Sequence, residues 1–430
     1  MIIWMFITLV VCLAASMPVA FAIGASSVVF CLLNGSPKLA IIAQRMVEGV
    51  DSFPLMALPL FILSGEIMAY GSTPRLMRLA NMLLGKVPGG LAATASLGCG
   101  LFGAISGSAV ATVAAIGSVV SPEMVKTGYK KSFTASLVAG SGVMGMIIPP
   151  SFCMVLYGAA SGYVSIEGMF LAGFVPGFAT ILLFIGYSFF MGKRHGYHSG
   201  RQAGLTARQR LLIVLDALPP LMMPAIILGG VLSGVFPPTE SAAIAAVYAF
   251  ILATFVYREV NPATLVRICT RSAISSAIVM LIIAMAAPFG WIMAMQGIPK
   301  LLATSVMELS SNLYVVVLLI TLVLLVLGTF MEGNSLIILL TPILLPLVTS
   351  LGMDAIQFGI VFMMAIAIGG VSPPLAVSLY VSARIVGIRI EETFPEVLHV
   401  LAILAFITIL CVFFPSFSLY LPSLFGRATL

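Results

Sequence analysis

Long apolar runs fill most of this chain, and only short polar stretches separate them. They cover approximately positions 2–33, 53–70, 91–121, 133–164, 168–191, 211–234, 240–257, 273–296, 313–350, 356–387 and 396–422. Several exceed the roughly 20 residues that one membrane-crossing helix needs, so the chain must fold back within them. The pattern predicts an all-α, polytopic membrane protein.

The first apolar run begins without a cationic segment and continues into further apolar sequence. A secretory signal peptide has a positively charged start and a short apolar core. We therefore interpret this run as a retained membrane helix.

Clusters of Gly and Pro interrupt the long runs. They lie at Gly98 to Gly107, Gly142 to Pro150, Gly328 to Gly333 and Gly369 to Pro374. An interrupted helix at membrane depth is tolerated only where its backbone is buried in protein or lines a cavity. These clusters therefore predict re-entrant turns and broken helices inside the bundle.

The clusters form two matched pairs, which indicates an internal duplication. In the first half GAISGS is followed by GSGVMGMIIPPS, and in the second half GTFMEGNS is followed by AIAIGGVSPPL. The Pro-Pro pairs at 149–150 and 373–374 match at nearly the same offset as Gly107 and Gly333. Small residues also permit close helix packing, but Gly/Pro-interrupted apolar segments in corresponding halves are typical of secondary-transporter binding sites.

Broken helices have a chemistry of their own. A break leaves carbonyl oxygens unpaired at the end of one half-helix and amide groups unpaired at the start of the next. Carbonyl oxygens can replace the hydration shell of a sodium ion, whereas the amides and the positive end of the helix dipole favour an anion. Each half of the chain therefore offers one candidate cage of oxygen atoms.

Composition supports the membrane assignment and suggests which loops face the cytoplasm. The chain is 61% hydrophobic and 8% charged, whereas soluble domains have about half and a quarter. Its formal net charge is +6, and cytoplasmic loops collect Lys and Arg. The segment 191–210 is rich in both and contains no acid, which predicts a cytoplasmic loop. No extended soluble segment carries a basic stripe, so nucleic-acid binding is excluded.

Motifs for catalysis are missing from the sequence. The six cysteines stand singly without a CxxC pair, which indicates neither a disulfide framework nor a zinc site. Neither a GxxxxGK[ST] loop nor an HExxH motif occurs. We therefore predict that the chain is not an enzyme and needs no cofactor, with a membrane-embedded enzyme as the remote alternative.

Two ionisable residues near the breaks are functional candidates, because such groups are expensive inside a membrane. Glu332 lies in the second Gly-rich turn, where it either neutralises an ion or caps the following half-helix. Arg384 follows the second Pro-Pro pair, and it either binds a substrate carboxylate bidentately or extends to the membrane interface.

These residues also carry a family likeness. The segments PLFILSGEIMAYG, GLFGAISGSAVATVAAIGSV, GSGVMGMIIPPS, GVFPPTESAAIAAVYA, GTFMEGNSLIILLTPILLP and GGVSPPLAVSLYV occur in this order. Together they resemble the large, DctM-like membrane subunit of a tripartite ATP-independent periplasmic (TRAP) transporter, over essentially the whole chain.

The resemblance implies an inverted-repeat, elevator-type ion transporter fold with two re-entrant helical hairpins and two broken helices. It implies import of a small organic anion, usually a carboxylate such as a dicarboxylate or a sialic acid, driven by a sodium gradient across the bacterial inner membrane. The implied partners are a separate small membrane subunit and a periplasmic substrate-binding protein. A stand-alone sodium- or proton-coupled carrier is the alternative.

The resemblance also implies a division of the chain. Scaffold helices would occupy 1–70, and the first repeat of the transport domain 71–190. The basic loop and further scaffold helices would occupy 191–296, and the second transport repeat 297–395. A C-terminal membrane helix would occupy 396–430.

Site residues follow from the same resemblance, motif by motif. The first sodium site would comprise Ser106, Ser108, Gly145, Ile148 and Pro150. The second would comprise Gly328, Glu332, Gly369, Ser372 and Pro374. Substrate would lie near Ser108, Cys153 and Arg384. Sialic acid members of the family are expected to have a hydroxyl where Cys153 stands, which argues against that substrate.

Overall fold

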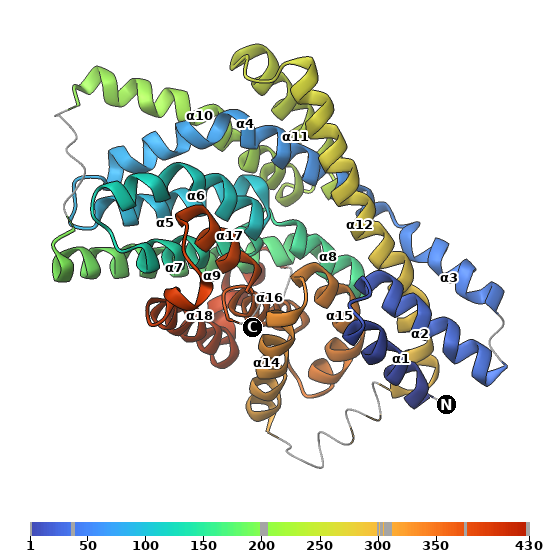
Figure 1. Ribbon diagram of the computed structural model, residues 1–430. Helices are drawn as coiled ribbons and strands as arrows, with labels where there is room; N and C mark the ends of the chain where they lie inside the picture. The colour runs from blue at the N-terminus through green and yellow to red at the C-terminus, as the bar shows by residue number, and fades with distance from the viewer. Residues whose placement is uncertain are drawn as a thin grey trace.

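The computed structural model describes residues 2–35, 39–197, 205–298, 301, 304, 312–373 and 376–426. All regular structure in those ranges is helical (Figure 1). Eight of the described helices are long and apolar enough to cross a membrane, and several apolar helices of 10–17 residues are shorter. The prediction of an all-α polytopic protein is confirmed.

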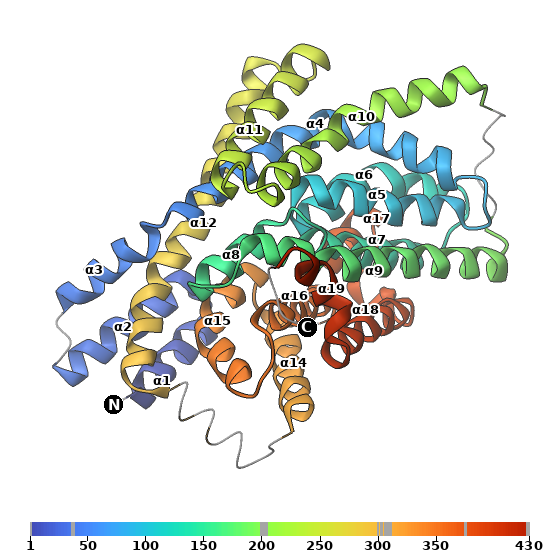
Figure 2. The ribbon, with the colours of Figure 1, turned by 180° about the vertical axis from the view of Figure 1, so that it is seen from behind.

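One group of helices is organised around two long arms. Its members are α1 (Ile2–Ala14), α2 (Val19–Asn34), α3 (Leu39–Val50), α4 (Ala57–Leu84), α10 (Ala207–Leu232), α11 (Pro238–Ile251) and α12 (Pro262–Met295). The first arm, α4, packs against α10 and α11, whereas the second arm, α12, packs against α2 and α3. The arms also contact each other, and both views show them crossing (Figures 1 and 2).

The second group consists of two halves that begin with corresponding elements. Its first half comprises α5 (Gly90–Ser106), α6 (Ala109–Lys126), α7 (Lys131–Gly142), the 3₁₀ turn η2 (Val143–Met146), α8 (Phe152–Ser161) and α9 (Ile166–His195). Its second half comprises α14 (Leu313–Phe330), α15 (Gly333–Ser350), α16 (Ala355–Gly369), α17 (Val377–Val386), α18 (Glu396–Phe413) and α19 (Pro415–Leu424). Each half is a helical hairpin followed by a broken helix, as the duplicated Gly/Pro clusters predict.

The two hairpin turns have different local causes. Gly107 ends α5 in the left-handed region, with φ of 62°, which a residue with a Cβ adopts only at a cost. Ser108 then caps α6 by accepting a hydrogen bond from the Ala111 amide. In the second hairpin, Met331 and Glu332 are extended, with φ of −123° and −66°, so this turn needs no left-handed residue.

The helix boundaries differ in part from the expected division of the chain. The boundary at 70/71 falls inside α4, which is kinked at Tyr70 but continues to Leu84. The boundary at 190/191 falls inside α9, which ends at His195. In the segment expected to form one C-terminal membrane helix, α18 ends at Phe413, and Pro415 starts a second helix, α19.

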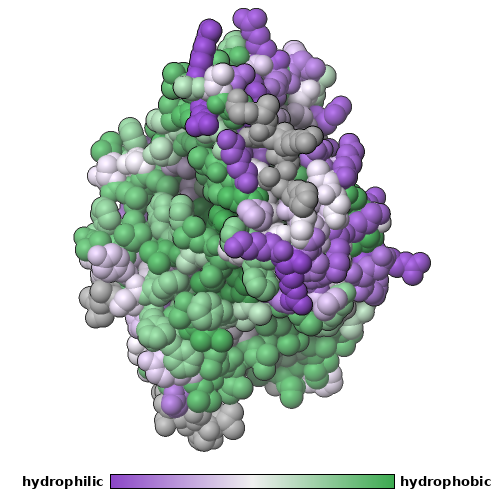
Figure 3. Space-filling view, turned by 90° about the vertical axis from the view of Figure 1, so that its left-hand side faces the viewer, coloured by the Kyte–Doolittle hydropathy of each residue, from purple (hydrophilic) through white to green (hydrophobic). Residues whose placement is uncertain are grey.

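The basic clusters gather at one end of the molecule. Lys86 follows α4, Lys126 ends α6, and Lys193 and Arg194 end α9. These helix ends lie together on the left of Figure 1, and the view of that side in Figure 3 shows hydrophilic residues gathered beside broad hydrophobic surfaces. By the positive-inside rule, this is the end that we expect in the cytoplasm.

A partly buried cation joins α4 to α10. Arg75, whose side chain is 13% exposed, has its Nε 3.1 Å from Asp216 Oδ1 and its Nη1 2.8 Å from Glu259 Oε1. Its guanidinium also lies 3.6 Å from the ring centroid of Tyr257. These contacts tie the first arm to α10 and to the segment after the π-helical turn η3 (Leu252–Val256).

We expect Arg75→Met to lower the free energy of unfolding by about 1–3 kcal/mol, because two carboxylates lose a shared and mostly buried cation. Thermal unfolding in detergent micelles measures the effect. The matched control is Arg45→Met, which removes an exposed pair with Glu48. Equal losses in the two variants would contradict a special role for the Arg75 cluster.

Candidate functional site

The two hairpin tips and the two helix breaks meet at one cavity of about 70 Å³. Ser108 at the first tip and Glu332 at the second both line it. Cys153 after the first break and Ser378 after the second line it as well. Segments from both halves of the chain therefore share a single site.

Helix ends of opposite polarity converge on this cavity. Among the described residues, α6, α8, α15 and α17 each contribute residues from their first turn to its lining. The last turns of α14 and α16 contribute Gly328, Ile366 and Ala367. Exposed amides at helix starts favour anions, and unpaired carbonyls at helix ends favour cations. The cavity therefore presents backbone groups of both polarities.

At the first tip, oxygen atoms lie close together. The hydroxyls of Ser106 and Thr112 are 2.9 Å apart, and the Thr112 hydroxyl donates to the Ser108 carbonyl at 2.7 Å. The Ser108 hydroxyl accepts from the Ala111 amide at 3.4 Å. Three hydroxyl oxygens and a carbonyl thus surround this turn. Thr112 was not identified from the sequence, although it follows Ser108 by one helical turn.

The first break lies in direct contact with this tip, which is possible because Gly145 has no side chain. A Cβ at Gly145 would lie 2.7 Å from both the Ser108 carbonyl oxygen and the Thr112 Oγ1. A Cβ at Gly107 would lie 3.4 Å from the Pro150 carbonyl oxygen. The structure therefore brings Ser106, Ser108, Gly145 and Pro150 together.

Ile148, the fifth residue of the expected first sodium site, directs its side chain elsewhere. A Cβ at Gly177 of α9 would lie 2.7 Å from Ile148 Cγ1, so this side chain packs against α9. Any contribution of Ile148 to an ion site would have to come from its main chain.

The second half repeats this close approach with different residues. A Cβ at Gly369 would lie 2.6 Å from the carbonyl carbon of Gly328, so the break touches the hairpin arm through backbone alone. The Ser372 hydroxyl donates to the Ile368 carbonyl at 2.8 Å, within its own helix segment. Glu332 lines the cavity and accepts a hydrogen bond from Asn334 Nδ2 at 2.7 Å. Pro374 lies outside the described residues.

Asn334 connects the two halves of the site and was missed by sequence reasoning. Its side chain is 9% exposed, and its Oδ1 accepts from the Cys153 thiol at 3.4 Å. Its other end donates to Glu332. The only sequence signal is its position in GTFMEGNS, two residues after the glutamate.

Arg384 does not line the cavity. It is exposed in the last turn of α17, whereas Val377 and Ser378 at the start of α17 form the lining. At roughly 1.5 Å per residue, Arg384 lies about 9 Å along the helix from Ser378. This placement does not support the expected contact of Arg384 with substrate.

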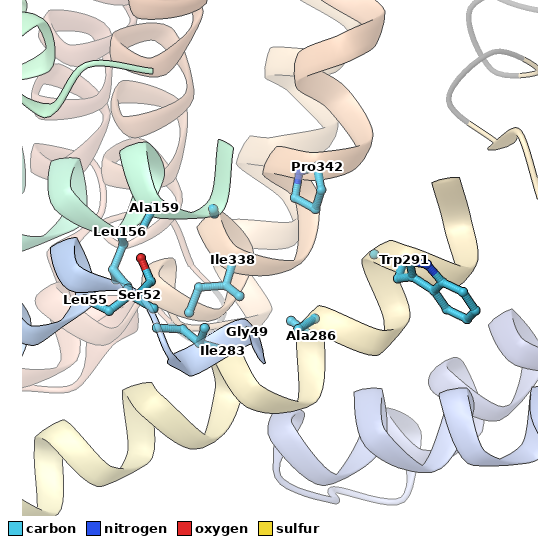
Figure 4. A pocket seen from close by; sticks show the side chains of 13 residues that line it. Gly49, Ser52, Leu55, Leu156, Ala159, Ile283, Ala286, Trp291, Ile338 and Pro342 are labelled. Carbon is cyan, nitrogen blue, oxygen red and sulfur yellow. The ribbon is translucent and has the colours of Figure 1, made fainter. Parts of the chain in front are cut away.

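A larger cavity, of about 270 Å³, lies where the two helix groups meet (Figure 4). Gly49 at the end of α3, Leu55 of the 3₁₀ turn η1 (Phe53–Met56) and Ile283 of α12 form one side. Leu156 of α8 and Ile338 of α15 form the other. Its lining is mainly apolar and rich in Gly and Ala.

The central cavity is lined by helix ends and single polar side chains. Among the described residues, no group of three or more His, Cys, Asp or Glu side chains could hold a metal. A helical membrane protein whose duplicated, broken helices converge on one internal site has the architecture of a secondary transporter.

Comparisons with known proteins define the family. Residues 6–417 match the family model "Tripartite ATP-independent periplasmic transporter, DctM component", and the chain belongs to this family. It is a transporter permease subunit of the bacterial inner membrane and not an enzyme.

Individual relatives extend along nearly the whole chain. The uncharacterized protein YgiK of Salmonella typhimurium is 39% identical, over 99% of this chain and 98% of its own. The isethionate TRAP transporter permease protein DctMQ of Oleidesulfovibrio alaskensis is 38% identical, over 95% of this chain and 64% of its own. The sialic acid TRAP transporter large permease protein SiaM of Vibrio cholerae is 35% identical, over 96% of each chain.

A solved structure shares the fold. The Alcanivorax borkumensis YdaH transporter superposes with a TM-score of 0.63 at 15% identity, over 88% of each chain. At this identity the match supports the architecture alone.

We expect Gly369→Ala to reduce uptake at least tenfold, because the new methyl group would overlap the backbone of Gly328 and displace the second hairpin from its break. Radiolabelled uptake by cells and protein abundance in their membranes separate this effect from loss of the protein. Gly186→Ala in α9 is the matched control, since nothing lies within 4 Å of its new Cβ. Full uptake by Gly369→Ala would show that the contact does not shape the site.

Proposed function

We propose that this chain is the sodium-driven permease for a small organic anion. It acts as the large membrane subunit of a tripartite transporter, fed by a periplasmic substrate-binding protein. The observation that carries this proposal is the convergence of two hairpin tips and two helix breaks on one cavity.

The oxygen-rich breaks support sodium as the coupling ion. One group combines hydroxyls of Ser106 and Ser108 with main-chain oxygens near Gly145 and Pro150. The other would combine main-chain oxygens of Gly328 and Gly369, whose backbones touch, with the carboxylate of Glu332, which lines the cavity beside Gly328. Hard oxygen donors without thiolate or imidazole ligands suit alkali and alkaline-earth ions better than transition metals.

The helix starts support an anionic cargo. The first turns of α6, α8, α15 and α17 direct amides and dipole ends towards the cavity. Relatives are named for isethionate, a sulfonate, and for sialic acid, a carboxylate. We propose a carboxylate cargo, whose charged group binds between the tips near Ser108 and Cys153.

The position of the cavity supports a moving tip. Both hairpin tips contribute to its lining, so a displacement of either tip would change access to the site. We propose that loading opens the tips and that α5–α9 with α14–α19 then slide as a transport domain along the arms α4 and α12. The weakly packed apolar gap of Figure 4 lies at the interface across which this movement would occur.

Partner requirements follow from the family. The chain covers 64% of the DctMQ relative, and we propose that it works with a small membrane subunit. Together with the binding protein it completes the transporter.

Reconstitution tests the proposal. The chain, its small subunit and its binding protein are placed in liposomes, and uptake of the anion bound by that protein is followed with and without an inward sodium gradient. We expect uptake only with the gradient. Equal uptake under a potassium gradient would overturn sodium coupling, and uptake without the binding protein would favour a stand-alone carrier.

We expect Ser106→Ala combined with Ser108→Ala to raise the sodium concentration for half-maximal uptake about tenfold, as lost hydrogen-bond-type contacts to a charged group imply. Two small hydroxyls contribute little packing volume, so the expected loss of stability is that of the Ser108 cap of α6, about 1 kcal/mol. Ser118→Ala, an exposed serine of the same hairpin, is the control. An unchanged sodium requirement in the double variant would remove both side chains from the ion site.

A further inference from the structure

A separate cavity of about 260 Å³ lies where the ends of α4 and α6 meet the start of α5. Asn81 lies in the last turn of α4, Glu123 in the last turn of α6, and Leu91 in the first turn of α5. These ends belong to the basic face described above, which we expect at the cytoplasmic surface of the membrane. The cavity joins the first arm to the first hairpin.

The wall of this cavity is apolar and reaches from the interior to the surface. Pro74 and Met77 of α4, Leu91 of α5, and Val119 and Val120 of α6 form it. Val120 is 4% exposed, whereas Val119 is 45% exposed. An apolar molecule can therefore enter from the lipid side, and apolar cavities of smaller volume than this, about 150 Å³, bind small hydrocarbons.

The rim carries groups of both charges. Arg78, whose side chain is 60% exposed, has its Nη2 3.5 Å from Asp216 Oδ2, and its Nε donates to the Pro74 carbonyl at 3.4 Å. Glu123 is exposed and forms no ion pair within the part of the chain that the structure describes. Asn81 adds an amide beside them. A ligand that carries only negative charge would satisfy Arg78 but would face the Glu123 carboxylate.

An unpartnered hydroxyl lies deeper in the same cavity. Thr94 of α5 is 1% exposed, lines the cavity, and its Oγ1 has no hydrogen-bond partner among the described residues. Buried polar groups are almost always hydrogen-bonded, because leaving one unpaired is costly. The hydroxyl therefore points to a ligand that supplies a hydrogen-bond acceptor below the charged rim.

We propose that this cavity binds one molecule of phosphatidylethanolamine. Arg78 pairs with the phosphate, and Glu123 with Asn81 accepts the primary ammonium. The Thr94 hydroxyl donates to an ester carbonyl, and the apolar wall covers the first part of an acyl chain. This order of charged, ester and hydrocarbon groups matches the order of polar and apolar residues from rim to interior. The bound lipid thereby lies between α4 and the first hairpin and contacts both.

Native mass spectrometry of the full chain tests the proposal. The protein is delipidated in detergent and titrated with equimolar phosphatidylethanolamine and phosphatidylglycerol of the same chain length. We expect one tightly held phosphatidylethanolamine, with at least fivefold preference over phosphatidylglycerol. Equal binding of the two lipids would overturn the proposal.

Three variants assign the contacts. Glu123→Gln should abolish the headgroup preference and leave total lipid binding unchanged, because it removes the negative charge that binds the ammonium group. Thr94→Val should weaken phosphatidylethanolamine binding about fivefold, as expected for one lost hydrogen bond. Val120→Trp should fill the cavity and remove the bound lipid. If that variant does not fold, Val119→Trp at the rim gives the same test.

Matched controls lie elsewhere on the surface. Glu391→Gln removes an exposed carboxylate and Val247→Trp adds bulk at an exposed position of α11, so neither should change lipid binding. A Thr94→Val or Glu123→Gln variant that binds both lipids as the unmodified chain does would overturn the proposal. So would a photo-crosslinker at position 119 that captures the small membrane subunit instead of lipid.

Discussion

The structure depends on one constraint: backbone groups inside a membrane must find partners. Each hairpin tip and each helix break interrupts the hydrogen-bond ladder at a place where lipid offers neither donors nor acceptors. The protein meets this constraint by bringing all of these interruptions to one internal cavity. Unpaired amides and carbonyls would be costly on the lipid face, whereas in this cavity they face other protein groups or a ligand.

Glycine makes this convergence possible. Gly145 lets the first break touch the Ser108 carbonyl, and Gly328 and Gly369 meet through backbone alone in the second half. The tips nevertheless differ, since the first turns through a left-handed Gly107 and the second through extended residues with Glu332. The duplicated halves thus share a geometry and differ in chemistry, with hydroxyls at one tip and a carboxylate at the other.

The positions of the charged residues reflect the same constraint. The Arg75 cluster joins α4 to α10, and further cations gather at helix ends on one face. The central cavity carries only the carboxylate of Glu332 as a formal charge among its lining residues. In the cavity the remaining polar groups are helix ends and single polar atoms. Most full charges lie where lipid headgroups and water can solvate them. The proposed lipid site, with its charged rim and apolar interior, lies at the boundary between these two regions.

The sequence by itself determined the all-helical membrane class, the two hairpins, the two breaks and their duplication. These features follow from local properties, namely long apolar runs and the inability of Gly and Pro clusters to continue a helix. Only the tertiary structure decided which side chains meet. Cys153 and Asn334 touch although they are 181 residues apart, while Arg384 lies away from the cavity although its motif adjoins the second break. The reason is physical: backbone interruption is encoded locally, whereas contact depends on how separate helices pack and on the direction in which each one leaves the shared cavity.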